Sequence, residues 1–219
     1  VWRRARYQPH DLSLGFARGR RKEEATLVMQ TVAWTLGRHG HRWAQIYFDV
    51  ANAFPSISWS AVDRRIAATT SAGDAALLQQ RHHSAMLLVE AGDGRVVWAA
   101  PSAGTMQGDG PAAQEFSEAY DRAQEQMVAD SVTLREELEM AFFEPLSRTA
   151  LTLNRVRYAD DAAQAVLHQS LASLMARVEV LDAAFAQHCG EIGLAQNTHK
   201  RQVLATFDTA QEAATAQQK

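Results

Sequence analysis

Three aspartates, at two places in the chain, have the clearest capacity for chemistry. Asp49 lies near the end of the apolar run 44–50, and Asp160 and Asp161 are adjacent between two segments that alternate apolar with polar residues. A carboxylate at the end of a buried strand must be solvated, paired or bound to a metal, and adjacent acids repel each other unless a cation is present. Carboxylate oxygens are the ligands that Mg²⁺ prefers. Taken alone, Asp49 is also compatible with a simple capping role.

Only tertiary structure can bring these acids together, because 111 residues separate Asp49 from Asp160. The run 44–50 is rich in aromatic and branched residues, which predicts a buried strand. The alternation at 151–158 and 163–167 predicts a hairpin with the two adjacent acids at its tip. We expect the first strand to lie beside this hairpin, so that all three carboxylates meet at one sheet edge.

Helical periodicity predicts the elements that back this sheet. Apolar residues recur at helical spacing in four segments, which are 23–37, 58–66, 112–127 and 171–185. Asp93 and Gly94 favour a tight turn between strands at 86–89 and 95–99, and a last strand is expected at 203–207. Helices on one face of a largely antiparallel sheet make an α+β fold.

The charges are distributed unevenly along the chain. Residues 1–42 hold nine basic and three acidic groups, a net charge of +6, which leaves −9 for the rest of a chain whose total is −3. A basic leading segment suits an arm that contacts phosphates, although a solvated basic tail explains it as well. No stretch approaches the roughly 18 apolar residues of a membrane span. We therefore expect an intracellular protein, in the nucleus or cytoplasm, with no membrane partner.

Cysteine and histidine usage gives no signal for a structural metal. The single cysteine, Cys189, cannot form an internal disulfide or a cysteine-based zinc site, and we expect it to be a small buried apolar residue. The eight histidines show no metal-ligand spacing. His82 and His83, like His39 and His41, are expected at the surface.

The tetrapeptide 158–161, Tyr-Ala-Asp-Asp, resembles the YADD motif of reverse transcriptases, in the alanine-containing form of non-LTR retrotransposons, group II introns and retrons. Four more segments resemble motifs of this family and occur in the family's order. These are 15–20, which resembles the segment after the fingers strands, 48–54, the first palm motif, 104–109, the glutamine-glycine motif, and 193–200, the motif with asparagine and lysine. Together the five elements cover nearly the whole chain.

The resemblance implies a fold and a domain organisation. The fold would be α+β, a polymerase palm with a ferredoxin-like antiparallel sheet backed by helices and a partial fingers segment. Residues 1–43 would belong to the fingers, 44–208 to the palm and 209–219 to a polar tail. We expect the chain to be a piece of a longer protein that also holds the other fingers strands and a thumb, and an endonuclease domain is compatible with this family. The isolated piece should polymerise weakly or not at all.

The activity that the resemblance implies is RNA-directed DNA polymerisation. A nucleotide would pass from a dNTP to the 3'-hydroxyl of a DNA primer on an RNA template, and positioning and charge neutralisation would do most of the work. Asp49 and Asp160 would hold two Mg²⁺ ions about 3.5–4 Å apart, with Mn²⁺ as a substitute. Asp161 and Val50 would complete the metal site.

The same resemblance assigns substrate contacts. Phe54 lies five residues past Asp49, where the family uses an aromatic ring to exclude the ribose 2'-hydroxyl, and an ordinary core aromatic is the alternative. Gln107 and Gly108 would lie against nucleotide and template, unless they form a simple loop. Lys200 could protonate or neutralise pyrophosphate, but a solvated lysine fits slightly better. Template or primer phosphates would meet four basic residues, namely Arg18, Arg20, Arg21 and Lys22.

Two other functions fit part of the pattern. The first is a decayed or domesticated retroelement palm that acts as a non-catalytic nucleic-acid-binding protein, although the three intact acids weigh against it. The second is another palm-type nucleotidyl enzyme, such as a cyclase, which has no need of Phe54 or of the pair at 107–108. The chain departs from the family at 110–113, where Gly-Pro-Ala-Ala replaces a segment that normally holds a serine-proline pair.

Overall fold

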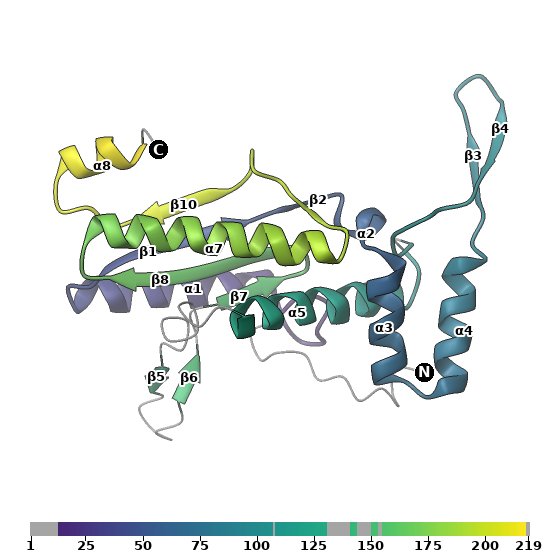
Figure 1. The fold of residues 1–219 in the computed structure, drawn as a ribbon, viewed down its shortest axis with the longest axis horizontal. Coiled ribbons are helices and arrows are strands. Elements are labelled where there is room, and N and C mark those ends of the chain that lie inside the picture. Colours follow the sequence, from purple (N-terminus) through teal and green to yellow (C-terminus); the bar gives the residue numbers. More distant parts are fainter. Residues whose placement is uncertain (1–12, 107, 131–140, 144–149, 153–154, 218–219) are drawn as a thin grey trace.

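A four-stranded antiparallel sheet forms the centre of the molecule (Figure 1). Its strand order is β10 (Gln202–Ala205), β1 (Arg42–Phe48), β8 (Asp161–His168) and β7 (Arg155–Tyr158). The strand β1 lies beside β8, as the sequence predicts. The computed structural model describes residues 13–106, 108–130, 141–143, 150–152 and 155–217.

Helices cover both faces of this sheet (Figure 1). One face packs against α5 (Ala112–Asp130) and α7 (Leu171–Glu191), and the other against α1 (Lys22–Arg38). The sequence predicts helices on one face, and α1 adds a layer on the other because β1 is apolar on both sides. Ile46 belongs to the core cluster with α5 and α7, whereas Trp43 belongs to the cluster with α1. Thus α1, which falls within the predicted fingers segment, packs directly on the sheet.

A pair of helices follows β1. The connection runs through β2 (Val50–Ala51), α2 (Ala53–Ser56), α3 (Trp59–Thr69) and α4 (Ala72–His83). Ser58 and Ser71 cap α3 and α4, because each side chain accepts a backbone N–H of the first turn. The apolar pattern predicts α3 with its serine cap. It does not predict α4, on which Leu77 is 60% exposed.

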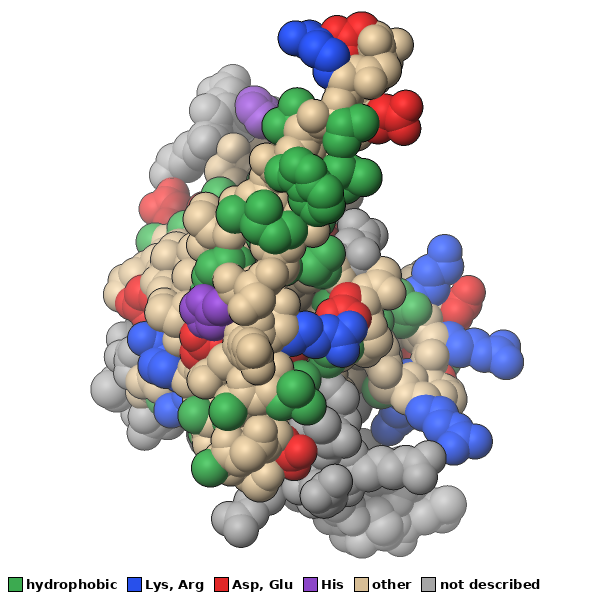
Figure 2. Space-filling view, turned by 90° about the vertical axis from the view of Figure 1, so that its right-hand side faces the viewer, with side chains coloured by type: hydrophobic (Ala, Val, Ile, Leu, Met, Phe, Trp, Pro, Cys, Tyr) green, Lys and Arg blue, Asp and Glu red, His purple; other side chains and the backbone are tan. Residues whose placement is uncertain are grey.

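A two-stranded hairpin protrudes after α4 (Figure 1). It consists of β3 (Leu87–Glu90) and β4 (Val96–Ala99), which pair only with each other among the described strands. Gly94 takes a φ of 78° in the turn, as the tight turn at residues 93–94 requires. The apolar side chains of both strands are exposed, and they gather along the hairpin below its charged tip (Figure 2).

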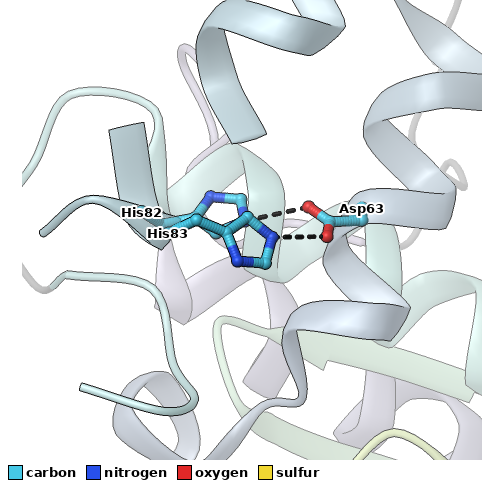
Figure 3. A group of neighbouring side chains, drawn as sticks. All are labelled: Asp63, His82 and His83. Atoms are coloured by element: carbon cyan, nitrogen blue, oxygen red, sulfur yellow. Dashed lines mark hydrogen bonds and ion pairs between the residues drawn. The ribbon is translucent and has the colours of Figure 1, made fainter. Parts of the chain in front are cut away.

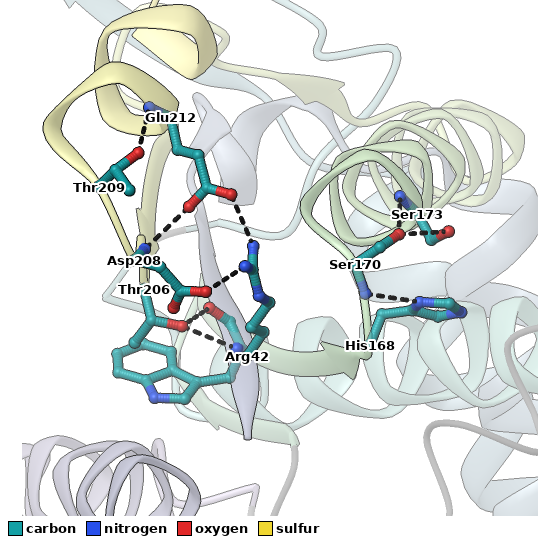
Figure 4. A network of polar contacts seen from close by, with 9 residues as sticks. Arg42, His168, Ser170, Ser173, Thr206, Asp208, Thr209 and Glu212 are labelled. Carbon is teal, nitrogen blue, oxygen red and sulfur yellow. Dashed lines mark hydrogen bonds and ion pairs between the residues drawn. The ribbon is translucent and has the colours of Figure 1, made fainter. Parts of the chain in front are cut away.

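The chain after β10 folds back onto the start of β1. Arg42 forms ion pairs with Asp208 and with Glu212, the latter at 3.0 Å between Nη1 and Oε1 (Figure 4). Glu212 belongs to α8 (Ala210–Gln217), so the predicted polar tail contains a helix. Two further pairs of short strands lie in the described residues. In these pairs β2 pairs with β9 (Ala195–Gln196), and β5 (Ala141–Phe143) pairs with β6 (Ala150–Thr152).

The cysteine and one histidine of the pair at 82–83 are both buried. Cys189 is buried, and burial raises the pKa of its thiol to about 12, so it is the inert apolar residue that we expect. His83 is exposed, but His82 is only 6% exposed, and its predicted surface position is wrong. The reason is that α4 packs its last turn against α3. None of the described helices has the length and apolarity that a membrane crossing demands.

Candidate active site

The two adjacent acids lie where the chain turns from β7 into β8. Tyr158 pairs with Asp161, so Ala159 and Asp160 form the turn itself. Ala159 takes a φ of 58°, a conformation that is uncommon for residues other than glycine. The structure therefore has the hairpin that the alternating pattern predicts, with the acids at its tip.

Asp49 follows β1 directly, at the same edge of the sheet. Phe48 is the partner of Ala162 in the β1–β8 ladder, so the next step along each strand sets Asp49 against Asp161. Burial raises the pKa of Asp161, and the charges of Asp160 and Asp49 raise it further. The three acids therefore lie within electrostatic reach of one another.

Asp49 is fixed by the segment that follows α7. Its backbone carbonyl accepts a hydrogen bond from the Asn197 N–H at 2.8 Å, and Val50 pairs with Gln196 in the β2–β9 ladder. The Nζ of Lys200 lies 3.4 Å from Asp49 Oδ1, but the lysine side chain is 68% exposed, so this ion pair is worth little. The segment that resembles the asparagine-lysine motif thus contacts the first acid.

One oxygen of Asp49 has unmet bonding capacity. Within the described part of the chain, its Oδ2 is buried and receives no hydrogen bond. A buried carboxylate oxygen without a donor is costly, and a divalent cation would remove that cost. The donor set at this edge, carboxylates with a backbone strand end beside them, fits Mg²⁺.

The three carboxylates are spaced apart rather than clustered. Among the described residues, their oxygens do not form a group in which all lie within 4.8 Å of one another. A single ion bound by all three acids at once would need a tighter group.

A buried ion pair fixes the turn that holds the acids. Arg157 on β7 lies 2.7 Å from Asp121 on α5, with the two side chains 3% and 6% exposed. The same arginine donates to the Ala159 carbonyl at 2.9 Å, and the Tyr120 hydroxyl donates to the Asp160 carbonyl at 3.1 Å. Both carbonyls of the turn therefore accept hydrogen bonds from buried side chains. Sequence reasoning missed Arg157, and its one signal was an arginine within a predicted half-buried strand.

Gly15 packs against the same turn. The Leu14 N–H donates to the Arg157 carbonyl at 2.8 Å, which lays this segment along β7. A Cβ on Gly15 would lie 1.9 Å from the Ala159 nitrogen, so no side chain fits there. The four basic residues predicted to contact phosphates follow this glycine, and all of them are exposed: Arg18, Arg20, Arg21 and Lys22.

Phe54 lies between two other phenylalanines. Its ring stacks on Phe116 at 4.8 Å between centroids and meets Phe16 edge-on at 5.7 Å. The Thr105 N–H donates to the Phe54 carbonyl at 2.8 Å. This hydrogen bond joins the glutamine-glycine segment to the short helix α2, which holds Phe54. Gly108 has a φ of 90°, which a glycine adopts without strain. Gln107 lies outside the described residues.

The fold is similar to that of solved telomerases, which are polymerases related to reverse transcriptases. An apo telomerase of Candida tropicalis, truncated from its C-terminal domain, matches with a TM-score of 0.63 and 13% identity over 91% of this chain and 37% of that one. A Candida albicans telomerase in complex with a TWJ fragment of telomeric RNA matches with a TM-score of 0.63 and 11% identity over 93% and 32%. This chain spans only about a third of these telomerases, and identity this low supports the fold alone. No protein-family model matches the chain, and no curated protein matches it.

Proposed function

We propose that this chain is the palm, with a part of the fingers, of an RNA-directed DNA polymerase. The observation that carries the proposal is the β1–β8 register, which sets Asp49 against the turn with Asp160 and Asp161. The order of the five motif-like segments and the similarity in fold to telomerases support it.

In this proposal Asp49 and Asp160 hold two Mg²⁺ or Mn²⁺ ions, with Asp161 and Val50 beside them. Bound divalent ions supply charge neutralisation at the phosphates and activation of the primer 3'-hydroxyl. The unbonded Oδ2 of Asp49 is the oxygen that is available to a cation. The exposed Lys200 can leave Asp49 and neutralise pyrophosphate, because its side chain is long and solvated.

Phe54 selects the sugar in this proposal. Contacts with Phe16 and Phe116 fix its ring, and a fixed ring cannot move aside for a 2'-hydroxyl. Deoxynucleotides are therefore the expected substrates. Gln107 and Gly108 contact the nucleotide and template, and the exposed basic residues at 18–22 contact template or primer phosphates.

The alanine in the tetrapeptide 158–161 supports a finer assignment. We propose a lineage close to non-LTR retrotransposons and group II introns, which use this form of the motif. The likeness to telomerases concerns the fold and does not distinguish these lineages.

The test is primer extension by a longer protein that contains this chain, on an RNA template with a DNA primer and dNTPs. Asp160→Asn should lower extension at least about a hundredfold, because it removes a proposed metal ligand. Asp93→Asn, on the protruding hairpin, is the matched control and should leave extension unchanged. Full activity of the Asp160→Asn variant would refute the proposed chemistry. RNA binding without any extension by the wild type would favour the non-catalytic alternative.

Phe54→Ala tests the sugar selection separately. The variant should incorporate ribonucleotides more readily relative to deoxynucleotides, since the ring no longer closes the space beside the sugar. The ratio of the two incorporation rates is the measurement. An unchanged ratio would return Phe54 to the role of a core aromatic residue.

A further inference from the structure

A second group of metal-ligating side chains lies between the middle of α3 and the end of α4. Asp63 is on α3, and His82 and His83 are the last two residues of α4. His82 Nε2 lies 2.9 Å from Asp63 Oδ1, and His83 Nε2 lies 2.8 Å from Asp63 Oδ2 (Figure 3). The three ligand atoms lie within 4.8 Å of one another, and no other group of three in the described ranges does.

The surrounding structure orients these three side chains before any ion binds. Trp59 lies one helical turn before Asp63, and its ring is 5.6 Å from the His82 ring and 4.7 Å from the His83 ring. The indole N–H of Trp59 donates to the Gly104 carbonyl at 2.9 Å. A site on packed helices, with its ligands oriented by neighbours, has the rigidity that metal binding needs.

The group is closed on one side and open on the other. The His82 side chain is 7% exposed and that of Asp63 24%, whereas that of His83 is 45% exposed. An ion can therefore enter from the His83 side, and water can complete its coordination there. An open position beside three protein ligands is a known arrangement for zinc.

The donor set selects the kind of ion. Two imidazole nitrogens and one carboxylate oxygen suit Zn²⁺ and related transition metals, whereas Mg²⁺ prefers oxygen alone. Zinc bonds of about 2.0–2.2 Å put the ligand atoms of a tetrahedral site about 3.3 Å apart. His82 Nε2 and His83 Nε2 face different oxygens of Asp63, at 2.9 and 2.8 Å, so an ion between them would be held by both oxygens of this carboxylate. Each of these two separations would then widen by about half an ångström.

We propose that Asp63, His82 and His83 bind a Zn²⁺ or a related transition-metal ion that clamps α4 to α3. The clamp adjoins the segment at 104–110, because Trp59 bonds to Gly104 and Arg81 pairs with Asp109. The alternative is that both histidines only donate hydrogen bonds to Asp63. The two arrangements exclude each other, since a metal takes the same two nitrogens that would carry the protons.

The test is calorimetric titration of the 219-residue chain with ZnCl₂ after removal of metals by a chelator. We expect one zinc per chain and a higher melting temperature in zinc. His83→Ala should weaken binding at least about tenfold, because removing a direct ligand costs no less than removing its outer-shell partner. This side chain is 45% exposed, so its loss should leave the circular dichroism spectrum unchanged. Co²⁺ should give visible absorption bands with the wild type and not with His83→Ala.

Two control variants separate this site from other places that could bind zinc. His39 and His41 form a second pair of neighbouring histidines, whose ring centroids lie 6.5 Å apart. His39→Ala should bind zinc like the wild type. Asp160→Asn removes a proposed Mg²⁺ ligand and none of these three side chains, so it should keep the visible Co²⁺ bands of the wild type, and the result does not depend on the polymerase proposal. The inference is overturned if the wild type binds no zinc, if His83→Ala binds as tightly as the wild type, or if either control variant loses the Co²⁺ bands.

Discussion

The hairpins β7–β8 and β3–β4 are both short, antiparallel and closed by tight turns, but their surroundings differ. The first lies in the central sheet, where Val156 and Arg157 are buried and the segment at 13–15 runs alongside. The second extends from the body of the molecule, and Leu88 and Trp98, which are partners across its ladder, are 58% and 64% exposed. Local sequence forms both hairpins, and only tertiary partners make one of them rigid.

The difference is consistent with the proposed place of the metal site. A metal site needs its ligands fixed within about 0.5 Å, which a supported hairpin supplies and an unsupported one does not. Asp160 sits on the hairpin whose turn carbonyls are bonded by Arg157 and Tyr120. Asp93, at the tip of the other hairpin, bonds only locally to Arg95 in the contacts that the structure describes. The following variants test this contrast.

The largest effect is expected from Arg157→Met. It removes the arginine from a buried ion pair with Asp121, so the free energy of unfolding should fall by about 3–5 kcal/mol. Urea unfolding measures it. The matched variant in the other hairpin is Arg95→Met, whose side chain is 80% exposed beside Asp93, and it should cost less than about 1 kcal/mol. Equal losses would mean that the two hairpins are supported alike.

A smaller effect is expected from Gly15→Ala. The new methyl group would lie 1.9 Å from the Ala159 nitrogen, so the backbone of the acid-bearing turn must shift, at a cost of about 1–3 kcal/mol. Gly92→Ala is the control, because a Cβ on Gly92, next to the β3–β4 turn, meets nothing within 4 Å. The urea midpoint of Gly15→Ala should be clearly lower than that of Gly92→Ala. If the Gly15 variant is as stable as that of Gly92, the segment at 13–15 does not brace the turn.

The elements that carry the acids could be predicted because their signals are local. Alternation marks β7 and β8, and the apolar run 44–50 marks β1. The pairing of β1 with β8 is not a local signal, and it is predicted only from the hypothesis that the three acids share one metal site. By contrast, α4 buries only Ala75, Leu78 and His82, while Leu77 faces solvent. A buried stripe that is this short and includes a histidine gives a weak signal for a helix.

The residues that the sequence did not reveal depend on distant partners. Arg157 pairs with Asp121 across 36 residues, and an arginine in an alternating strand is normally read as solvent-facing. His82 and His83 are adjacent, which is not a metal-ligand spacing. Their common partner Asp63 lies on another helix, so only the packing of α3 on α4 assembles the group.

Asp161→Asn should change the free energy of unfolding by a smaller amount, and should raise it rather than lower it. The pKa of Asp161 is raised by burial first and then by the charges of Asp160 and Asp49, so the folded chain binds this proton more tightly than the unfolded chain. Stability therefore falls as pH rises from the ordinary pKa of 3.8 through the raised value. At pH 7 the variant should be slightly more stable, by less than about 1 kcal/mol. In urea titrations at a pH below 3.8, the variant and the wild type should be equally stable, because the aspartate is then protonated in both the folded and the unfolded chain. A loss of stability at pH 7 would show that the charge of Asp161 is already compensated within the chain.

The smallest change in stability is expected from Trp98→Ser on the protruding hairpin. This ring is 64% exposed, so the free energy of unfolding should change by no more than about 0.5 kcal/mol. Trp43→Ser, which removes an indole that is only 8% exposed beneath α1, should instead cost about 3–5 kcal/mol. Exposed apolar strands at a sheet edge promote association between chains. Any self-association of the wild type in sedimentation velocity should therefore be lower in Trp98→Ser. A large stability loss would mean that the β3–β4 hairpin packs against the body of the molecule, and the contrast between the two hairpins would then disappear.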